Sequence, residues 1–135
     1  MKGLIAVVAL DVVSAAPLAL AQDARPAPKP TTLLQETVEG MPTGEQQEIR
    51  VLTATFKPGD KTVHHSHPFP VTVHILEVTF IIEMDGHEPV TLSAGESYVE
   101  PADTAMIGSN QSDADVKALV FFVSTPGTPF LVPTT

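Results

Sequence analysis

From Leu33 onward the sequence is divided into short apolar runs by turn-forming residues, and this division constrains the fold more than any other feature. Runs of this length are typical of β-strands, and no stretch after residue 31 has a convincing 3.6-residue apolar repeat. Turn residues such as Pro58-Gly59-Asp60 stand between the runs. The predicted strands are 33–37, 49–56, 62–67, 71–84, 89–92, 97–99, 105–107 and 116–124.

About eight short strands in roughly a hundred residues predict an all-β domain, a sandwich or barrel that closes its own edges. No helix longer than about two turns is expected. Asp85-Gly86 predicts a hairpin, because a type I′ turn needs positive φ at both central residues. Residues 116–123 are apolar almost throughout, which indicates either a fully buried central strand or a strand at a homodimer interface.

The N-terminus has the features of a secretory signal peptide, residues 1–21. Lys2 precedes an apolar stretch, and Ala19-Leu20-Ala21 provides a small-x-small cleavage site. The stretch is too short and interrupted to span a bilayer, although Asp11 within it leaves an uncleaved anchor or an unusual leader as alternatives. We therefore expect a secreted or periplasmic protein, with a Pro- and Ala-rich linker at 22–32, one domain at 33–135 and no membrane association after cleavage.

Charge and cysteine content exclude several classes of function. The net charge is −9, and the few basic residues disfavour binding to nucleic acid or anionic membranes, which depends on neutralising phosphate. The absence of cysteine excludes disulfides, a thiolate nucleophile and Cys-type metal sites. A small-molecule ligand or a protein partner remains.

Histidines are concentrated between positions 64 and 74, where four of the five occur. Because side chains alternate along a strand, His65 and His67 share one face and His64 points to the other. Two imidazoles on one face can bind one ion, and neutral imidazole suits Zn, Cu, Fe and Ni. The alternative is that the cluster is polar surface at a strand end.

The surroundings of this pair resemble the cupin superfamily. Gly59, five residues, then His65-Ser66-His67, with Glu77 and Gly86 beyond, is similar to the first cupin motif. Gly95, five residues, then Pro101, with Asn110 nine residues later, is similar to the second. The resemblance covers roughly residues 33–124 and implies a cupin-type antiparallel β-barrel (a double-stranded β-helix or jelly roll), often dimeric. It also implies a metal held by three histidines and one glutamate.

The chain departs from that ligand set at two positions. The glutamate position is Val71 or, counting one residue further, Thr72, and the third histidine position is Met106. Asp103 stands where the second motif has glycine and could complete a two-His, one-carboxylate site of the non-haem iron type. The Met106 thioether would instead favour copper, while methionine is also a common filler of irregular cores. A divalent transition metal (Fe, Mn, Ni, Zn or Cu) is the expected cofactor.

Two further interpretations remain open. The cavity is a non-catalytic pocket for a small molecule, walled by Val71, Val73, Ile75 and Met106, with Tyr98 at its rim; or His65 and His67 have only a structural role, in hydrogen bonds to the backbone. If the protein is an enzyme, the resemblance implies a metal-dependent cupin such as a dioxygenase-like oxidoreductase or an isomerase. Val78 stands where the family commonly has glycine in an L-E-G sequence, so Glu77 is expected near a turn or edge.

Overall fold

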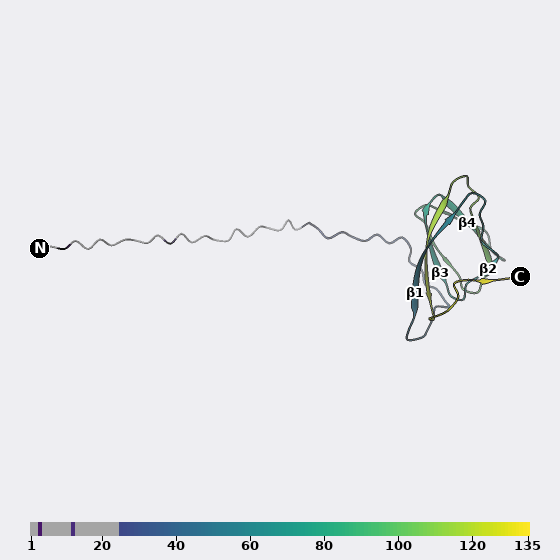
Figure 1. Cartoon of the computed structure of the whole chain (residues 1–135), viewed down its shortest axis with the longest axis horizontal. Helices are drawn as coiled ribbons and strands as arrows, with labels where there is room; N and C mark the ends of the chain where they lie inside the picture. Colours follow the sequence, from purple (N-terminus) through teal and green to yellow (C-terminus); the bar gives the residue numbers. More distant parts are fainter. Residues whose placement is uncertain (1–2, 4–11, 13–24) are drawn as a thin grey trace. The chain divides into compact units, whose positions relative to one another are not determined.

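The computed structural model describes residues 25–135 together with Gly3 and Val12 (Figure 1). The predicted cleavage site after Ala21 therefore lies outside the described residues. The chain divides into two compact units, Met1–Pro30 and Thr31–Thr135. In the first unit, residues 25–30 are exposed and have no regular secondary structure. The second unit contains every strand described below.

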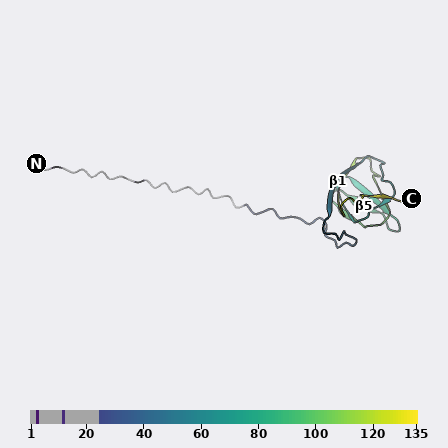
Figure 2. The ribbon, with the colours of Figure 1, turned by 60° about the horizontal axis from the view of Figure 1, so that its bottom comes forward.

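Nine strands form two antiparallel sheets (Figures 1 and 2). The four-stranded sheet has the order β1 (Glu48–Phe56), β8 (Val116–Ser124), β3 (Val71–Glu77) and β6 (Ser97–Glu100). The five-stranded sheet has the order β5 (Val90–Ser93), β4 (Thr79–Met84), β7 (Met106–Ser109), β2 (His65–Ser66) and β9 (Val132–Pro133). The all-β prediction is confirmed, and among the described residues no helix is long and apolar enough to cross a membrane.

The core lies on the inner faces of these sheets. Along β8 burial alternates, with Val116, Ala118, Val120 and Phe122 buried and the residues between them more exposed. This is the period-2 pattern of a strand with one face in the core. Because β8 pairs with both β1 and β3, it is a central strand whose outward face still carries apolar residues such as Phe121, which is 40% exposed. The homodimer stays a prediction.

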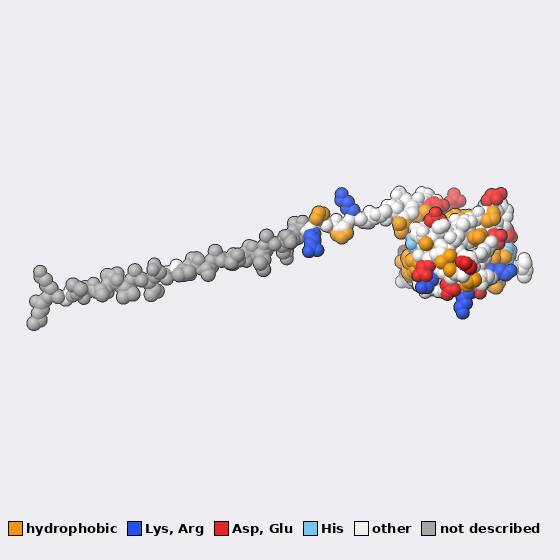
Figure 3. Space-filling model, turned by 90° about the horizontal axis from the view of Figure 1, so that it is seen from above, with side chains coloured by type: hydrophobic (Ala, Val, Ile, Leu, Met, Phe, Trp, Pro, Cys, Tyr) orange, Lys and Arg blue, Asp and Glu red, His pale blue; other side chains and the backbone are white. Residues whose placement is uncertain are grey.

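The surface of the second unit is rich in carboxylates, as the net charge of −9 requires. Figure 3 shows acidic side chains spread over the face in view, with apolar side chains between them.

The strand predictions for 49–56 and 116–124 are confirmed almost to the residue, whereas others need correction. Residues 33–37 are not a strand; they are exposed and pair with no sheet, and Leu34 and Glu36 instead border a surface groove together with Phe121. Of the run 62–67 only His65–Ser66 is a strand, and Pro68 and Pro70, which cannot donate to a ladder, prevent its extension beyond that point. The strand β9 was not predicted.

The predicted hairpin at Asp85-Gly86 exists, but its turn differs from type I′. Strands β4 and β5 pair on either side of it, and the His87 N–H donates to the Met84 carbonyl (3.1 Å). Only Gly86 has a positive φ there, at 75°, whereas Asp85 does not. The loop between the strands is correspondingly longer than a two-residue turn.

The run 71–84 is two strands rather than one, because Val78 interrupts it and the strands on either side lie in different sheets. Val78 has a φ of 70°, in the left-handed region that β-branched residues rarely adopt. The strands on either side belong to different sheets, so this residue carries the chain from one sheet to the other. It occupies the position where cupins commonly have glycine, which adopts this φ without steric cost.

Replacing Val78 with glycine is expected to stabilise the domain by roughly 0.5 kcal/mol. The left-handed conformation costs an L-residue about 1–2 kcal/mol, and glycine removes this cost. Glycine loses about 0.5–1 kcal/mol more conformational entropy on folding. Loss of the packing of the valine side chain reduces the net stabilisation further. Urea unfolding measures the change as a higher midpoint. Val78→Ala is the control, since it loses the packing and keeps a Cβ; a Val78→Gly variant no more stable than Val78→Ala would contradict the prediction.

Candidate metal centre and cavity

A cavity of about 90 Å³ lies between the two sheets and contains the predicted histidine pair. His65 belongs to β2 and His67 follows it by one residue, and both side chains are buried, with 4% and 2% exposed. The cavity walls are mainly apolar, with polar groups only from Thr62, His65, His67 and Glu100. The site is thus a small apolar space with a polar cluster at one side.

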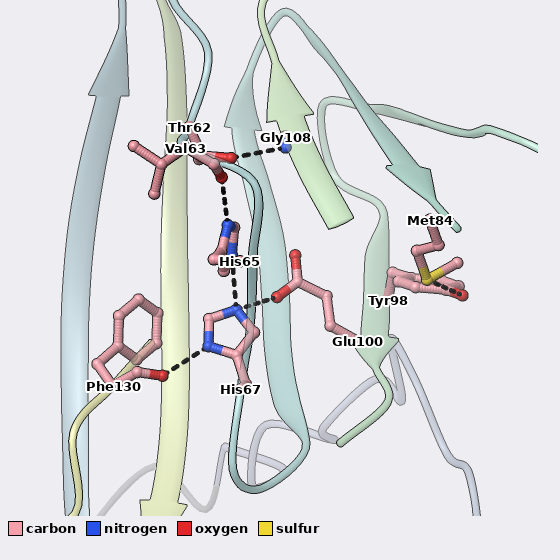
Figure 4. A network of polar contacts seen from close by, with 9 residues as sticks. All are labelled: Thr62, Val63, His65, His67, Met84, Tyr98, Glu100, Gly108 and Phe130. Atoms are coloured by element: carbon pink, nitrogen blue, oxygen red, sulfur yellow. Dashed lines mark hydrogen bonds and ion pairs between the residues drawn. The ribbon is translucent and has the colours of Figure 1, made fainter. Parts of the chain in front are cut away.

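Backbone carbonyls fix the tautomer of both histidines. The Nδ1–H of His65 donates to the Val63 carbonyl (2.7 Å), and the Nδ1–H of His67 donates to the Phe130 carbonyl (2.6 Å), as Figure 4 shows. A carbonyl oxygen only accepts, so each Nδ1 must carry the proton. The two Nε2 atoms are then free, and they face each other at 3.2 Å.

Glu100, at the end of β6, brings a carboxylate to the same place. Its Oε2 lies 3.1 Å from His67 Nε2, and the residue is 9% exposed. When both imidazoles are neutral, two nitrogen lone pairs and a carboxylate oxygen meet with no hydrogen between them. Such an arrangement needs either a proton, on an imidazole or on the Glu100 carboxyl, or a metal ion between the lone pairs.

Burial lowers the pKa of His65 below its ordinary value, and the His67 ring acts in the same direction. The hydrogen bond to Val63 and the Glu100 carboxylate oppose this shift without reversing it. Neutral His65 therefore persists to lower pH than an exposed histidine and keeps its Nε2 lone pair available.

Among the described residues, no three His, Cys, Asp or Glu side chains converge on one point as they do around a bound ion. His65, His67 and Glu100 form a chain of two contacts in which His67 Nε2 is the shared atom. The contact lengths of 3.2 and 3.1 Å are close to the separation of two ligands of one ion, about 3 Å for bonds near 2.1 Å. Two of the three donor pairs are therefore spaced as two ligands of one ion are, whereas the third pair, His65 and Glu100, makes no polar contact in this structure.

The other two predicted ligands, Asp103 and Met106, have no side-chain polar contact with the histidines. The Asp103 side chain is exposed and does not line the cavity; its backbone N–H donates to the His67 carbonyl (2.8 Å). Met106 is buried in the core and is the partner of His65 across β2 and β7. Neither side chain contacts the histidine nitrogens in this structure.

Of the residues predicted to surround the cavity, Val73 lines it. Val71 and Ile75 point inward on the same strand but belong to the neighbouring core. Tyr98 points away from the histidines, as Figure 4 shows, and its hydroxyl donates to the Met84 sulfur (3.9 Å). Burial, with the Glu36 and Glu100 carboxylates nearby, raises the pKa of Tyr98.

Glu100 is the site residue that sequence reasoning missed. It is the register partner of Val71 across β3 and β6, so the carboxylate stands directly opposite the position where the cupin motif has glutamate. No local pattern in the sequence pointed to Glu100, because its place beside His67 depends on the pairing of β3 with β6.

The sequence matches the family model described as cupin domain over residues 52–122, more than half of the chain. A DMSP lyase structure is similar, with 15% identity and a TM-score of 0.56 over 64% of this chain; only 44% of that protein's chain is covered. An uncharacterized conserved protein with a double-stranded β-helix domain from Klebsiella pneumoniae is similar at 17% identity and a TM-score of 0.54, over 73% of this chain and 90% of that one.

An RmlC-like cupin family protein with a double-stranded β-helix fold from Methanocaldococcus jannaschii is similar at 13% identity and a TM-score of 0.52, over 70% of this chain and 94% of that one. No curated protein matches the sequence. The solved structures agree with the two-sheet antiparallel architecture described above, and the family match spans both motifs. The chain therefore belongs to the cupin domain family.

Proposed function

We propose that this domain binds one divalent transition metal through His65, His67 and Glu100 and takes a small organic ligand into the adjoining cavity. The observation that carries the proposal is the tautomer of the two histidines. Both Nδ1–H groups are bonded to carbonyls, so both Nε2 lone pairs are directed at the same small space as a buried carboxylate. Two imidazoles and one carboxylate form the donor set of non-haem Fe(II) oxygenases, and they also suit Mn, Ni and Zn.

When bound, such an ion acts as a Lewis acid toward an oxygen of the ligand. The chain's own residues orient the metal ligands: the Val63 and Phe130 carbonyls fix the two rings, and mainly apolar side chains line the rest of the cavity. The cavity volume of about 90 Å³ is smaller than the roughly 150 Å³ of an apolar cavity that binds benzene. A ligand contained in it is therefore limited to a few heavy atoms with one polar end.

Titration of metal-free, untagged protein with Co²⁺ tests the proposal. We expect one ion per chain, because His65, His67 and Glu100 form one site, and visible absorption of bound Co²⁺ reports its occupancy. His65→Ala with His67→Ala should abolish binding. The matched control is His74→Ala with His87→Ala, which removes two histidines outside the cavity and should leave binding unchanged. A double variant of His65 and His67 that keeps the same metal at the same stoichiometry would place the site elsewhere.

A second candidate is a metal-free binding pocket, in which a proton supplies the cation. The His67–Glu100 contact of 3.1 Å favours it, because a protonated His67 can donate Nε2–H to Glu100 and thereby form a buried ion pair. In that case Co²⁺ does not bind, and elemental analysis of the purified protein finds no stoichiometric metal. The same measurements thus separate the two candidates.

A further inference from the structure

We propose that residues 125–135, hereafter the closing segment, are a movable wall of the cavity. In its closed position the segment orients His67, and when it lifts it opens the cavity to solvent and ligand. The proposal deepens the proposed function by naming the route of entry. The movement itself does not depend on whether a metal is bound.

The closing segment forms part of the cavity wall directly beside the histidines. Phe130 and Leu131 line the cavity, and the Phe130 ring lies 4.7 Å from the His67 ring and 5.4 Å from the Phe122 ring. The Phe130 carbonyl accepts the hydrogen bond that fixes the His67 tautomer (Figure 4). One residue of the segment thus covers the cavity with its side chain and positions His67 with its backbone.

The segment is attached more weakly than the sheets around it. None of its residues is buried, and its one strand, β9, has two residues at the edge of a sheet and pairs only with the equally short β2. Pro126, Pro129 and Pro133 have no N–H to donate. Few buried contacts and exposed backbone hydrogen bonds are features of regions that open without global unfolding.

A small number of polar contacts close the segment. Arg50 Nη2 donates to the Thr128 carbonyl (2.6 Å), and the Thr134 N–H donates to the His64 carbonyl (2.9 Å). The Thr134 hydroxyl also contacts His64 Nδ1, and His64 Nε2 lies 3.1 Å from Asp85. These contacts are reversible and partly exposed to solvent, so they hold a closed state that can open.

A hinge lies at the start of the closing segment. Strand β8 ends at Ser124, and a turn follows in which the Thr128 N–H donates to the Thr125 carbonyl (3.2 Å). Gly127 in this turn has a φ of 80°, a conformation that glycine enters and leaves without steric cost. The opposite wall is different in kind, because β8 and β3 are each paired on both sides and cannot move separately. Entry is therefore expected on the side of the closing segment.

A reversible crosslink between β2 and β9 tests the movement. Ser66 and Val132 are register partners, and opposed residues of an antiparallel pair have Cα separations of about 4.5–5.5 Å, within the range of a disulfide. The chain has no native cysteine, so Ser66→Cys with Val132→Cys allows a single bridge that reduction releases. The control bridge, Thr55→Cys with Lys117→Cys, joins exposed register partners of β1 and β8 and leaves the segment free.

The measurement is the rate at which diethyl pyrocarbonate modifies His65 and His67, read by peptide mass spectrometry, with exposed His87 as internal reference. We expect the β2–β9 bridge to slow modification of both buried histidines at least tenfold, to leave His87 unchanged, and to lose its effect on reduction. The control bridge should change neither. Equal rates with the β2–β9 bridge closed and open, or equal slowing by the control bridge, would overturn the proposal.

Metal entry gives a separate result. If the domain binds Co²⁺, the β2–β9 bridge should slow both its association and its removal by a chelator, with the dissociation constant little changed. If Co²⁺ does not bind at all, the proposed metal function fails, and the histidine modification rates still decide whether the segment moves.

Discussion

Replacing Glu100 with valine is expected to weaken Co²⁺ binding at least about 100-fold, and adding Val71→Glu to that variant is expected to restore most of the affinity. The first effect follows because Glu100 supplies the one carboxylate of the donor set, and even an outer-shell partner of a metal ligand typically contributes 10–100-fold. The second follows from the register of β3 and β6. Val71 and Glu100 are opposed and both inward, so the exchange moves one carboxylate across a strand pair while side-chain composition stays the same.

The affinity of each variant is measured by Co²⁺ titration, and urea unfolding shows whether it is folded. Glu88→Val, in an exposed loop, is the control for the loss of one negative charge and should leave affinity unchanged. Unchanged affinity in Glu100→Val would remove Glu100 from the site. Failure of the exchange variant, in a folded protein, would show that the carboxylate must approach from β6.

Replacing Gly108 with alanine is expected to destabilise the domain by about 1–3 kcal/mol, the range found for overpacked cores. A Cβ on Gly108 would lie 2.5 Å from Phe80 Cζ and 2.9 Å from Phe80 Cε1. The Phe80 ring is 4% exposed and packs against Phe56 at 4.8 Å, so it cannot turn away without disturbing the core. Glycine at this position in β7 is required by the close approach of a ring.

The clash is tested by a double-mutant cycle in urea. In a Phe80→Leu background the added methyl group meets a shorter side chain, and Gly108→Ala should cost far less than in the native background. Gly44→Ala is the matched control, because an added Cβ there meets only an ordinary contact at 3.5 Å. Equal costs of Gly108→Ala in both backgrounds would exclude Phe80 as the cause.

Local patterns in the sequence predicted much of the fold. The long strands 49–56 and 116–124 emerged because each has an apolar run bounded by turn residues, and both are confirmed. The break at Val78 could not be read from hydropathy, because Val78 continues the apolar run while its positive φ interrupts the strand. Residues 33–37 are the opposite case: their apolar composition predicted a strand, but they pair with no other strand.

Local patterns in the sequence also predicted part of the candidate site. Alternation correctly placed His65 and His67 on one face, and their Nε2 atoms meet at 3.2 Å. The contribution of Phe130 could not be foreseen, because it depends on a contact with His67, 63 positions earlier in the chain. Phe130 itself lies in a Pro-rich stretch in which no strand was predicted. Glu100 depends likewise on the pairing of β3 with β6, which no local pattern encodes. Export from residue 22 onward and homodimer formation stay predictions.

The pairing of β1 with β8 has a consequence for how the chain folds during synthesis. Phe56 pairs with Val116, so roughly sixty further residues must be synthesised after β1 before the first residue of its partner strand, β8, exists. At about 5–20 residues per second, that delay is on the order of 3–12 s, during which neither edge of β1 is paired. Long-range pairing of this kind also slows folding after the chain leaves the ribosome, because the entropy cost of closing the loop arises before the stabilising contacts form. A nascent chain of this topology therefore stays unfolded, and open to chaperones, until β8 has been made.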